Sequence, residues 1–180
     1  MTAAPDDEAA LLTRARQGDR EALDALLRRH LPDVYGLTRR LVRDPDLAAD
    51  AAQEAMINAV RALASFRGDA SFRSWLLRIA VNAARTVGRK RSRRREVDLE
   101  LVRELPAGTK DPDGVTITRI EAERAVRMLE RLPPKQRLAV TLRIQSGLSY
   151  AEVAEVMGGT EGAARVNYHL GIRKLRELLA

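Results

Sequence analysis

Residues 148–180, LSYAEVAEVMGGTEGAARVNYHLGIRKLRELLA, decide the fold of the last part of the chain. Ser149 and Glu152 have the spacing of a capping box at the start of one helix, and Thr160 can cap the next helix. The glycine pair 158–159 between them can take the positive φ that a sharp turn needs. The stretch therefore predicts a short helix, a tight turn and a long helix, which is the layout of a helix-turn-helix that binds DNA.

The long helix is predicted to have two different faces. Residues at alternating spacings of four and three form one stripe that should be buried: Ala164, Tyr168, Gly171, Leu175 and Leu178. The outward side carries the candidate DNA-reading residues Arg165, Val166, Asn167, His169, Leu170, Arg173 and Lys174. Arginine reads guanine, asparagine pairs with adenine, and apolar groups contact the methyl of thymine. The alternative is a basic helix that only packs in a bundle; the paired caps and the outward apolar side chains argue against it.

Composition predicts an all-α protein that binds a polyanion. Apolar residues make up 45% of the 180 residues but aromatic residues only 3%, and strand-favouring runs are nearly absent. The net charge is +7, and arginine greatly outnumbers lysine, which suits phosphate recognition. Because domains commonly hold about 100 to 150 residues, we interpret the chain as two small helical domains.

Several classes of function are excluded or disfavoured. The absence of cysteine excludes disulfides, thiolate zinc sites and cysteine nucleophiles. His30 and His169 lie far apart without an acidic pattern around them, so we expect no metal, no cofactor and no catalytic site. We interpret His30 as a helix-end residue. The acidic N-terminus lacks a secretory signal and no long uncharged apolar run follows, so we expect a cytoplasmic protein without membrane insertion.

The distribution of charge predicts the domain boundaries. Basic residues outnumber acidic ones in residues 1–95 and 119–180, whereas acidic residues dominate residues 96–118. This connector contains proline and glycine and little helical period, which predicts a flexible linker. Two DNA-contacting domains would thus be tethered, and tethering raises the effective concentration of the second contact once the first is made.

Turn residues divide the first domain into predicted helices at about 7–17, 20–30, 32–43, 46–64 and 72–87. On the last of these helices one arc should be core: Phe72, Trp75, Leu76, Ile79 and Ala83. Another arc is polar and cationic: Arg78, Asn82, Arg85 and Arg89. Trp75 could stack on a base, but its position on the core arc favours packing. The dense basic run 89–95 is typical of a solvated tail or of nonspecific phosphate contact.

Two stretches carry a resemblance to a known family. They are residues 46–85, DLAADAAQEAMINAVRALASFRGDASFRSWLLRIAVNAAR, and residues 132–178, LPPKQRLAVTLRIQSGLSYAEVAEVMGGTEGAARVNYHLGIRKLREL. Together they resemble an extracytoplasmic-function sigma factor of the sigma-70 family. The resemblance implies that the first domain is region 2, which binds the clamp of core RNA polymerase and opens the minus-10 element of the promoter. It implies that the last domain is region 4, which binds the minus-35 element and the polymerase flap, and that an anti-sigma factor is a further partner.

The resemblance also assigns residues in the first domain. Asp50, Gln53 and Glu54 match the pattern of the helix that docks on the clamp, where carboxylates would meet basic polymerase side chains; a solvated helix face is the alternative. The candidate minus-10 residues are the loop that captures a base flipped out of the duplex, together with the cationic arc that follows it: Phe66, Arg67, Gly68, Asp69, Ala70, Ser71, Arg78, Asn82 and Arg85.

The chain departs from the family pattern in both domains. Val166 and Asn167 replace a common Ser-Arg pair, Leu170 replaces a usual arginine, and the alanine pair 51–52 replaces larger apolar residues in the clamp helix. Fewer cationic contacts predict a smaller salt dependence of DNA binding, with contacts to thymine methyl groups instead.

Two other functions remain open from the residues alone. A free-standing helix-turn-helix repressor or activator usually dimerises on half-sites, and this chain shows no appended dimerisation helix. An adaptor that binds only protein would not need the basic arc on residues 78–89.

Overall fold

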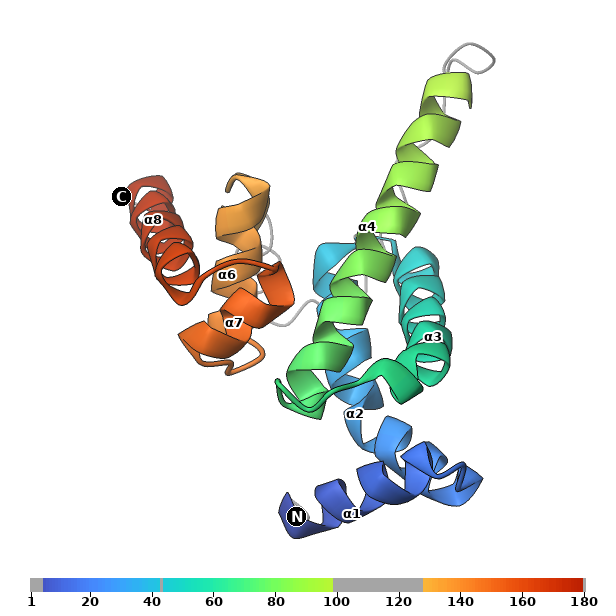
Figure 1. Ribbon diagram of the computed structural model, residues 1–180. Coiled ribbons are helices and arrows are strands. Elements are labelled where there is room, and N and C mark those ends of the chain that lie inside the picture. Colours follow the sequence, from blue (N-terminus) through green and yellow to red (C-terminus); the bar gives the residue numbers. More distant parts are fainter. Residues whose placement is uncertain (1–4, 43, 99–127, 180) are drawn as a thin grey trace, which may run out of the picture. The chain divides into compact units, whose positions relative to one another are not determined.

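The computed structural model describes residues 5–42, 44–98 and 128–179, and within these residues the secondary structure is helical without strands. The chain divides into two compact units, an N-terminal unit of residues 1–85 and a C-terminal unit of residues 86–180. Both can be followed in Figure 1. The prediction of an all-α protein built from two small helical domains is confirmed.

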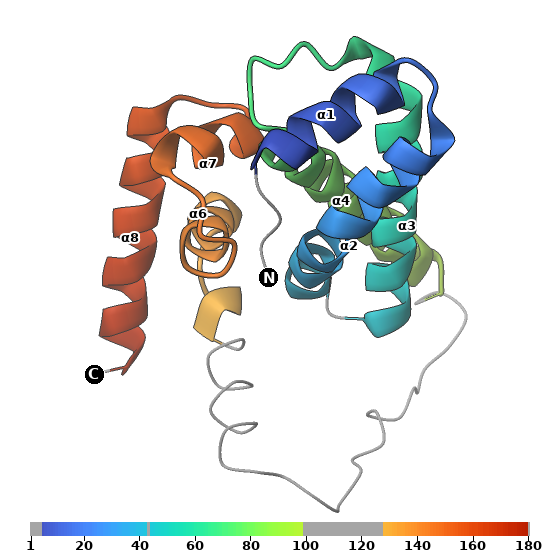
Figure 2. The same cartoon turned by 90° about the horizontal axis from the view of Figure 1, so that it is seen from below.

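Helices α1 to α3 and the part of α4 up to residue 85 build the N-terminal unit, with a short 3-10 helix before α4. Their bounds are α1 Pro5–Arg16, α2 Arg20–Leu41, α3 Pro45–Ala62, η1 Leu63–Ser65 and α4 Phe72–Asp98. Helix α2 packs against both α1 and α3. Figure 2 shows α1 crossing one end of α2. The largest fully buried side chains of this unit are Leu26, Leu37, Leu76, Leu77, Val34 and Val81, which come from α2 and α4 and form its core.

Helix α2 corrects the prediction of two helices at 20–30 and 32–43. It is one helix that begins after Asp19, whose carboxylate accepts hydrogen bonds from two backbone amides of the first turn, and it contains Pro32. Proline inside a helix removes one backbone hydrogen bond and usually bends or ends the helix. The buried stripe continues through Pro32, however, from Leu26 to Val34 and Leu37. Burial of this stripe offsets the loss, and tertiary packing overrides the local signal.

Helix α4 is longer than predicted. It runs to Asp98 and not to residue 87, so the basic run 89–95 has a helical backbone. No proline interrupts this segment, and arginine and glutamate are good helix formers. The linker predicted at 96–118 begins within this helix, and the rest of it lies outside the described residues.

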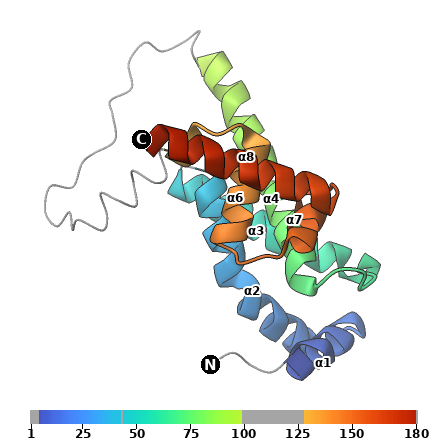
Figure 3. The same cartoon turned by 90° about the vertical axis from the view of Figure 1, so that its left-hand side faces the viewer.

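Helices α6 (Pro134–Ile144), α7 (Tyr150–Met157) and α8 (Glu161–Leu179) form the described part of the C-terminal unit beyond α4. Helix α8 packs against α6 and α7, which Figure 3 shows from the side. The predicted inner stripe of α8 faces these helices: Ala164 and Gly171 are buried, and Tyr168, Leu175 and Leu178 are half-buried.

The predicted caps of the helix-turn-helix are confirmed, and one detail of the turn is corrected. Ser149 and Glu152 form the capping box, and the Ala163 amide donates to the Thr160 hydroxyl at 3.2 Å. Gly158 ends α7 in the left-handed region with φ 70°, whereas Gly159 does not adopt a positive φ. One left-handed residue is enough to reverse the chain after a helix.

Candidate nucleic-acid interface

The outward face of α8 gathers most of the predicted DNA-reading residues around one shallow hollow. Five side chains line it: Arg165, Val166, His169, Leu170 and Arg173. Val166 is 57% exposed and, with the half-buried Leu170, gives the hollow an apolar surface. The other two predicted residues lie at the margin, where the Asn167 amide donates to the Ala163 carbonyl at 2.8 Å and Lys174 pairs with Glu177 at 3.1 Å. The face is therefore cationic with an apolar centre.

Two residues that the sequence reading missed hold the Arg165 side chain in place. Its guanidinium lies 2.8 Å from the Glu161 carboxylate and 5.0 Å from the centre of the Tyr150 ring. Tyr150 comes from α7 and packs edge-on against Tyr168 of α8 at 5.7 Å. The i,i+4 spacing of Glu161 and Arg165 was a usable signal, but the contact with Tyr150 needs the fold. The guanidinium is thus anchored at the start of α8.

The apolar centre of the face leads to a prediction about thymine. If α8 contacts a thymine of a minus-35 element, as the family resemblance implies, replacing that thymine by uracil should weaken promoter binding about 2- to 4-fold, because one buried methyl group is lost. Val166→Ala should reduce this sensitivity. Leu179→Ala, which alters an equally exposed apolar residue at the far end of α8, should keep it. Binding of thymine and uracil promoters by the polymerase holoenzyme measures the difference, and equal affinities would contradict the prediction.

In the N-terminal unit, the loop 66–71 is anchored by one aromatic residue. Phe66 is 4% exposed and packs against the rings of Phe72 at 5.7 Å and Trp75 at 5.1 Å. Phe66 was predicted among the base-capturing residues. Its ring is buried and packs on Phe72 and Trp75, so it anchors the loop to α4. Trp75 packs, as its place on the core arc predicted. Arg67, Gly68, Asp69 and Ser71 are exposed, and Ala70 is half-buried.

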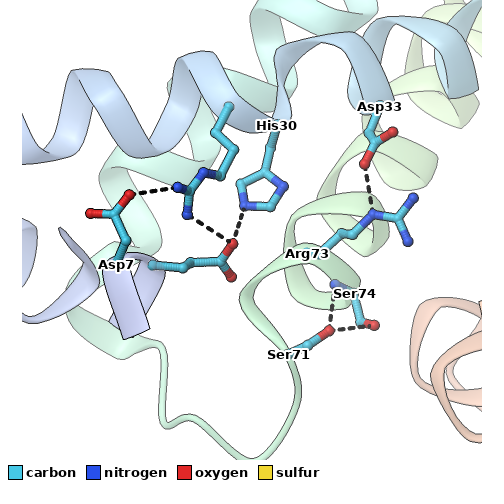
Figure 4. A network of polar contacts seen from close by, with 8 residues as sticks. Asp7, His30, Asp33, Ser71, Arg73 and Ser74 are labelled. Carbon is cyan, nitrogen blue, oxygen red and sulfur yellow. Dashed lines mark hydrogen bonds and ion pairs between the residues drawn. The ribbon is translucent and has the colours of Figure 1, made fainter. Parts of the chain in front are cut away.

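The start of α4 is fixed by polar contacts that Figure 4 shows. The Ser71 hydroxyl accepts from the Ser74 amide at 3.1 Å and donates to the Ser74 hydroxyl at 2.9 Å, which caps the helix. Arg73 donates to Asp33 of α2 at 2.6 Å. Further along α4, the predicted residues Arg78, Asn82 and Arg85 are all exposed, and their spacings of four and three place them on one face.

A pocket opens between this loop and α1, a helix to which the sequence reading gave no role. Its lining residues are Glu8, Ala9, Leu12, Phe66, Gly68, Ala70 and Phe72. The volume is about 310 Å³, at the small end of ligand pockets. No sequence signal pointed to this pocket, because its two walls are about 60 residues apart in the chain.

His30 ties α1 to α2 beside this pocket, which corrects its interpretation as a helix-end residue. The ring is 5% exposed, lies in the middle of α2 and packs against Phe72 at 5.4 Å. Its Nε2 atom is 3.1 Å from the Glu8 carboxylate (Figure 4). Burial lowers the pKa of His30 below its ordinary value of 6.5, while the charge of Glu8 acts in the opposite direction.

This pKa shift predicts that the N-terminal unit loses stability below pH 6.5. Between the lowered pKa and 6.5 the unfolded chain binds more protons at His30 than the folded chain does, so stability falls as pH falls, by at most about 1.4 kcal/mol per pH unit. Above pH 6.5 His30 contributes no pH dependence. Urea unfolding followed by Trp75 fluorescence measures the slope. His30→Gln should flatten it, His169→Gln in the other unit should not, and equal slopes for His30→Gln and wild type would contradict the prediction.

The predicted polymerase-binding residues share the exposed side of α3. Asp50, Gln53 and Glu54 are exposed, whereas alanines at 51, 52 and 55 turn into the core. Glu54 accepts a hydrogen bond from Asn58 one turn later at 3.1 Å. Small residues on the inner side let α3 pack closely in the unit, and the outer side exposes the carboxylates of Asp50 and Glu54.

Two kinds of feature are absent from the described residues. None of their helices has the length and apolar character needed to cross a membrane. No three of their histidine, aspartate or glutamate side chains are grouped so that they could hold a metal ion.

Both units match known families. Residues 26–95 match the family described as Sigma-70 region 2, and residues 122–175 match Sigma-70, region 4. The chain is 38% identical over 169 residues to the RNA polymerase sigma-H factor of Pseudomonas aeruginosa, an alignment that covers 89% of this chain and 87% of that protein. It is 36% identical over 163 residues to the ECF RNA polymerase sigma-E factor of Escherichia coli K12, covering 86% and 85%.

A solved structure agrees with these matches. The sigma factor RpoE of Bartonella quintana, in complex with the anti-sigma factor NepR, superimposes with a TM-score of 0.68 at 25% identity, and the match covers 87% of this chain and 95% of that chain. The family matches and the two relatives extend over both helical units, and the chain therefore belongs to the extracytoplasmic-function sigma factors of the sigma-70 family.

Proposed function

We propose that this sigma factor recognises a promoter at two separate places, first as duplex and then as single strand. The C-terminal unit would insert α8 into the major groove of the minus-35 element. The observation that carries the proposal is the outward face of α8. There Glu161 and Tyr150 fix the position of the Arg165 guanidinium beside the exposed Val166. Arg165 would read guanine, Asn167 adenine and Val166 with Leu170 thymine methyl groups, while Arg173 and Lys174 hold phosphates.

The N-terminal unit would capture an unpaired base of the minus-10 element. Flipping a base costs a few kcal/mol of stacking, so a pocket and cationic surroundings must offset it. The pocket beside loop 66–71 offers aromatic and apolar walls. Arg67, Arg78 and Arg85 are exposed and would attract the phosphates of the single strand, and Asn82 would face the same nucleotide.

Transcription itself would be catalysed by the polymerase, and the sigma factor would supply no catalytic group. Asp50, Gln53 and Glu54 would dock on the clamp of core RNA polymerase, and the C-terminal unit on the flap. Domains at residues 1–95 and 119–180 would be joined by a linker at 96–118. Two weak sites joined in this way bind tightly when their spacing on DNA is right.

An anti-sigma factor could regulate this chain by binding its proposed polymerase-binding or DNA-binding faces. The Bartonella quintana relative is a sigma factor in complex with an anti-sigma factor. We propose such a partner for this chain, acting in the cytoplasm by covering the polymerase-binding or DNA-binding faces. A pull-down from cells before and after stress would identify it.

A reconstituted transcription reaction tests the proposal. Core RNA polymerase, the purified protein and a promoter template should give a specific run-off transcript without any other factor. A free-standing regulator would need another sigma factor for the same transcript, and an adaptor that binds only protein would give none. A transcript that depends on a second sigma factor would refute the proposed function.

A further inference from the structure

The pocket between α1 and the loop 66–71 contains one charged residue among apolar walls. Phe66 and Phe72 contribute aromatic rings, and Gly68, with φ 86° and no side chain, leaves room at the rim. A flat ring with polar edges fits such a lining, because apolar walls bind its faces and a polar group can reach its edge. Glu8 of α1 supplies that polar group.

The Glu8 carboxylate is fixed through one of its two oxygens. Oε2 lies 3.1 Å from His30 Nε2 and 3.7 Å from Arg29 Nη1. Arg29 also binds Asp7 at 2.7 Å, so Asp7 and Glu8 of α1 are both held against α2. No described residue pairs with Oε1 of Glu8. The carboxylate is therefore held in position by His30 and Arg29, partly neutralised by Arg29, and able to accept a further hydrogen bond through Oε1.

We propose that Glu8 selects the captured base, accepting a hydrogen bond from an exocyclic amino group. A carboxylate only accepts hydrogen bonds. Cytosine, adenine and guanine each carry an amino group, whereas thymine presents carbonyl oxygens on both sides of its one ring N–H. The pocket thus takes an amino-bearing base and rejects thymine. This inference rests on the proposed function and adds the class of base that the minus-10 site accepts.

Promoters that differ by single bases test the inference in the polymerase holoenzyme. Each position of the minus-10 element is changed in turn to all four bases, and the run-off transcript is measured. With the wild-type protein, one position should favour an amino-bearing base over thymine by about 10-fold, the range of a good base-edge contact. Replacing the preferred base by its analogue without the amino group should cause the same loss: pyrimidin-2-one for cytosine, purine for adenine, hypoxanthine for guanine.

A matched pair of variants separates base contact from helix docking. Glu8→Gln keeps the shape but presents an amide that can also donate to thymine, so discrimination at that position should fall to about 2-fold. Asp7→Asn weakens the neighbouring contact with Arg29 without touching the pocket lining, so it should keep the wild-type discrimination.

Three results would overturn the inference: wild-type transcription that accepts thymine at every position, full activity with the amino-free analogue, or equal shifts in the two variants. The analogue experiment uses the wild-type protein and so does not depend on the folding of a variant. Absence of any promoter-dependent transcript would instead refute the proposed function itself.

Discussion

Gly171→Ala should destabilise the C-terminal unit, although alanine is the better helix former. A Cβ atom at this position would lie 2.7 Å from Cγ2 of Val140 and 3.3 Å from the carbonyl oxygen of Gln136 in α6. Val140 is 2% exposed, so its methyl group has little room to move. Overpacking of this kind costs about 1 to 3 kcal/mol. The gain in helix propensity offsets about 1 kcal/mol of it, which leaves a net loss of up to about 2 kcal/mol.

Gly162→Ala is the matched control for this prediction. Gly162 lies in the first turn of the same helix, and nothing is within 4 Å of a Cβ built there. The same chemical change should therefore be neutral or stabilising. Amide hydrogen exchange in α6 and α8 measures both variants in the full chain. If the amides of α6 and α8 exchanged as slowly in Gly171→Ala as in Gly162→Ala, the close approach of α6 and α8 would not limit the stability of the unit.

The sequence predicted those parts of the fold that depend on local signals. The capping box at Ser149, the cap at Thr160 and the inner stripe of α8 follow from spacings within one or two turns, and all three are present. Pro32 was also a local signal, but it misled, because the buried stripe of α2 outweighs one lost hydrogen bond. Local signals are thus reliable where no long-range packing opposes them.

The candidate sites were predicted less completely, because their geometry joins residues far apart in the chain. His30 and Glu8 are 22 residues apart, and only the packing of α1 on α2 brings them together. The family resemblance placed Phe66 in the capture loop but could not show that it is buried beneath the loop. The contact between Arg165 and Tyr150 likewise requires α7 and α8 to cross.

The largest effect on activity should come from Arg165→Glu combined with Asn82→Ala. The first change replaces the cation that we propose reads guanine in the minus-35 element by an anion, which would repel phosphates and which stands one turn after Glu161. The second change removes the exposed amide of α4 that we propose contacts the minus-10 element. Loss of one base contact costs about 1 to 3 kcal/mol. Tethered sites support each other, so we expect at least about a 100-fold loss of promoter-directed transcript.

Arg28→Glu is the control that separates this loss from a general effect of charge reversal. Arg28 pairs with Asp24 at i,i+4 and 2.8 Å, as Arg165 pairs with Glu161, and its exposed side chain on α2 lies outside both proposed DNA sites. The two reversals disturb the same kind of surface ion pair, which is worth less than about 1 kcal/mol. Arg28→Glu should therefore leave the transcript within about twofold. The Arg165→Glu, Asn82→Ala protein lacks both proposed base contacts. If it initiated transcription as well as the wild type, neither α8 nor α4 would contact the promoter in the way proposed.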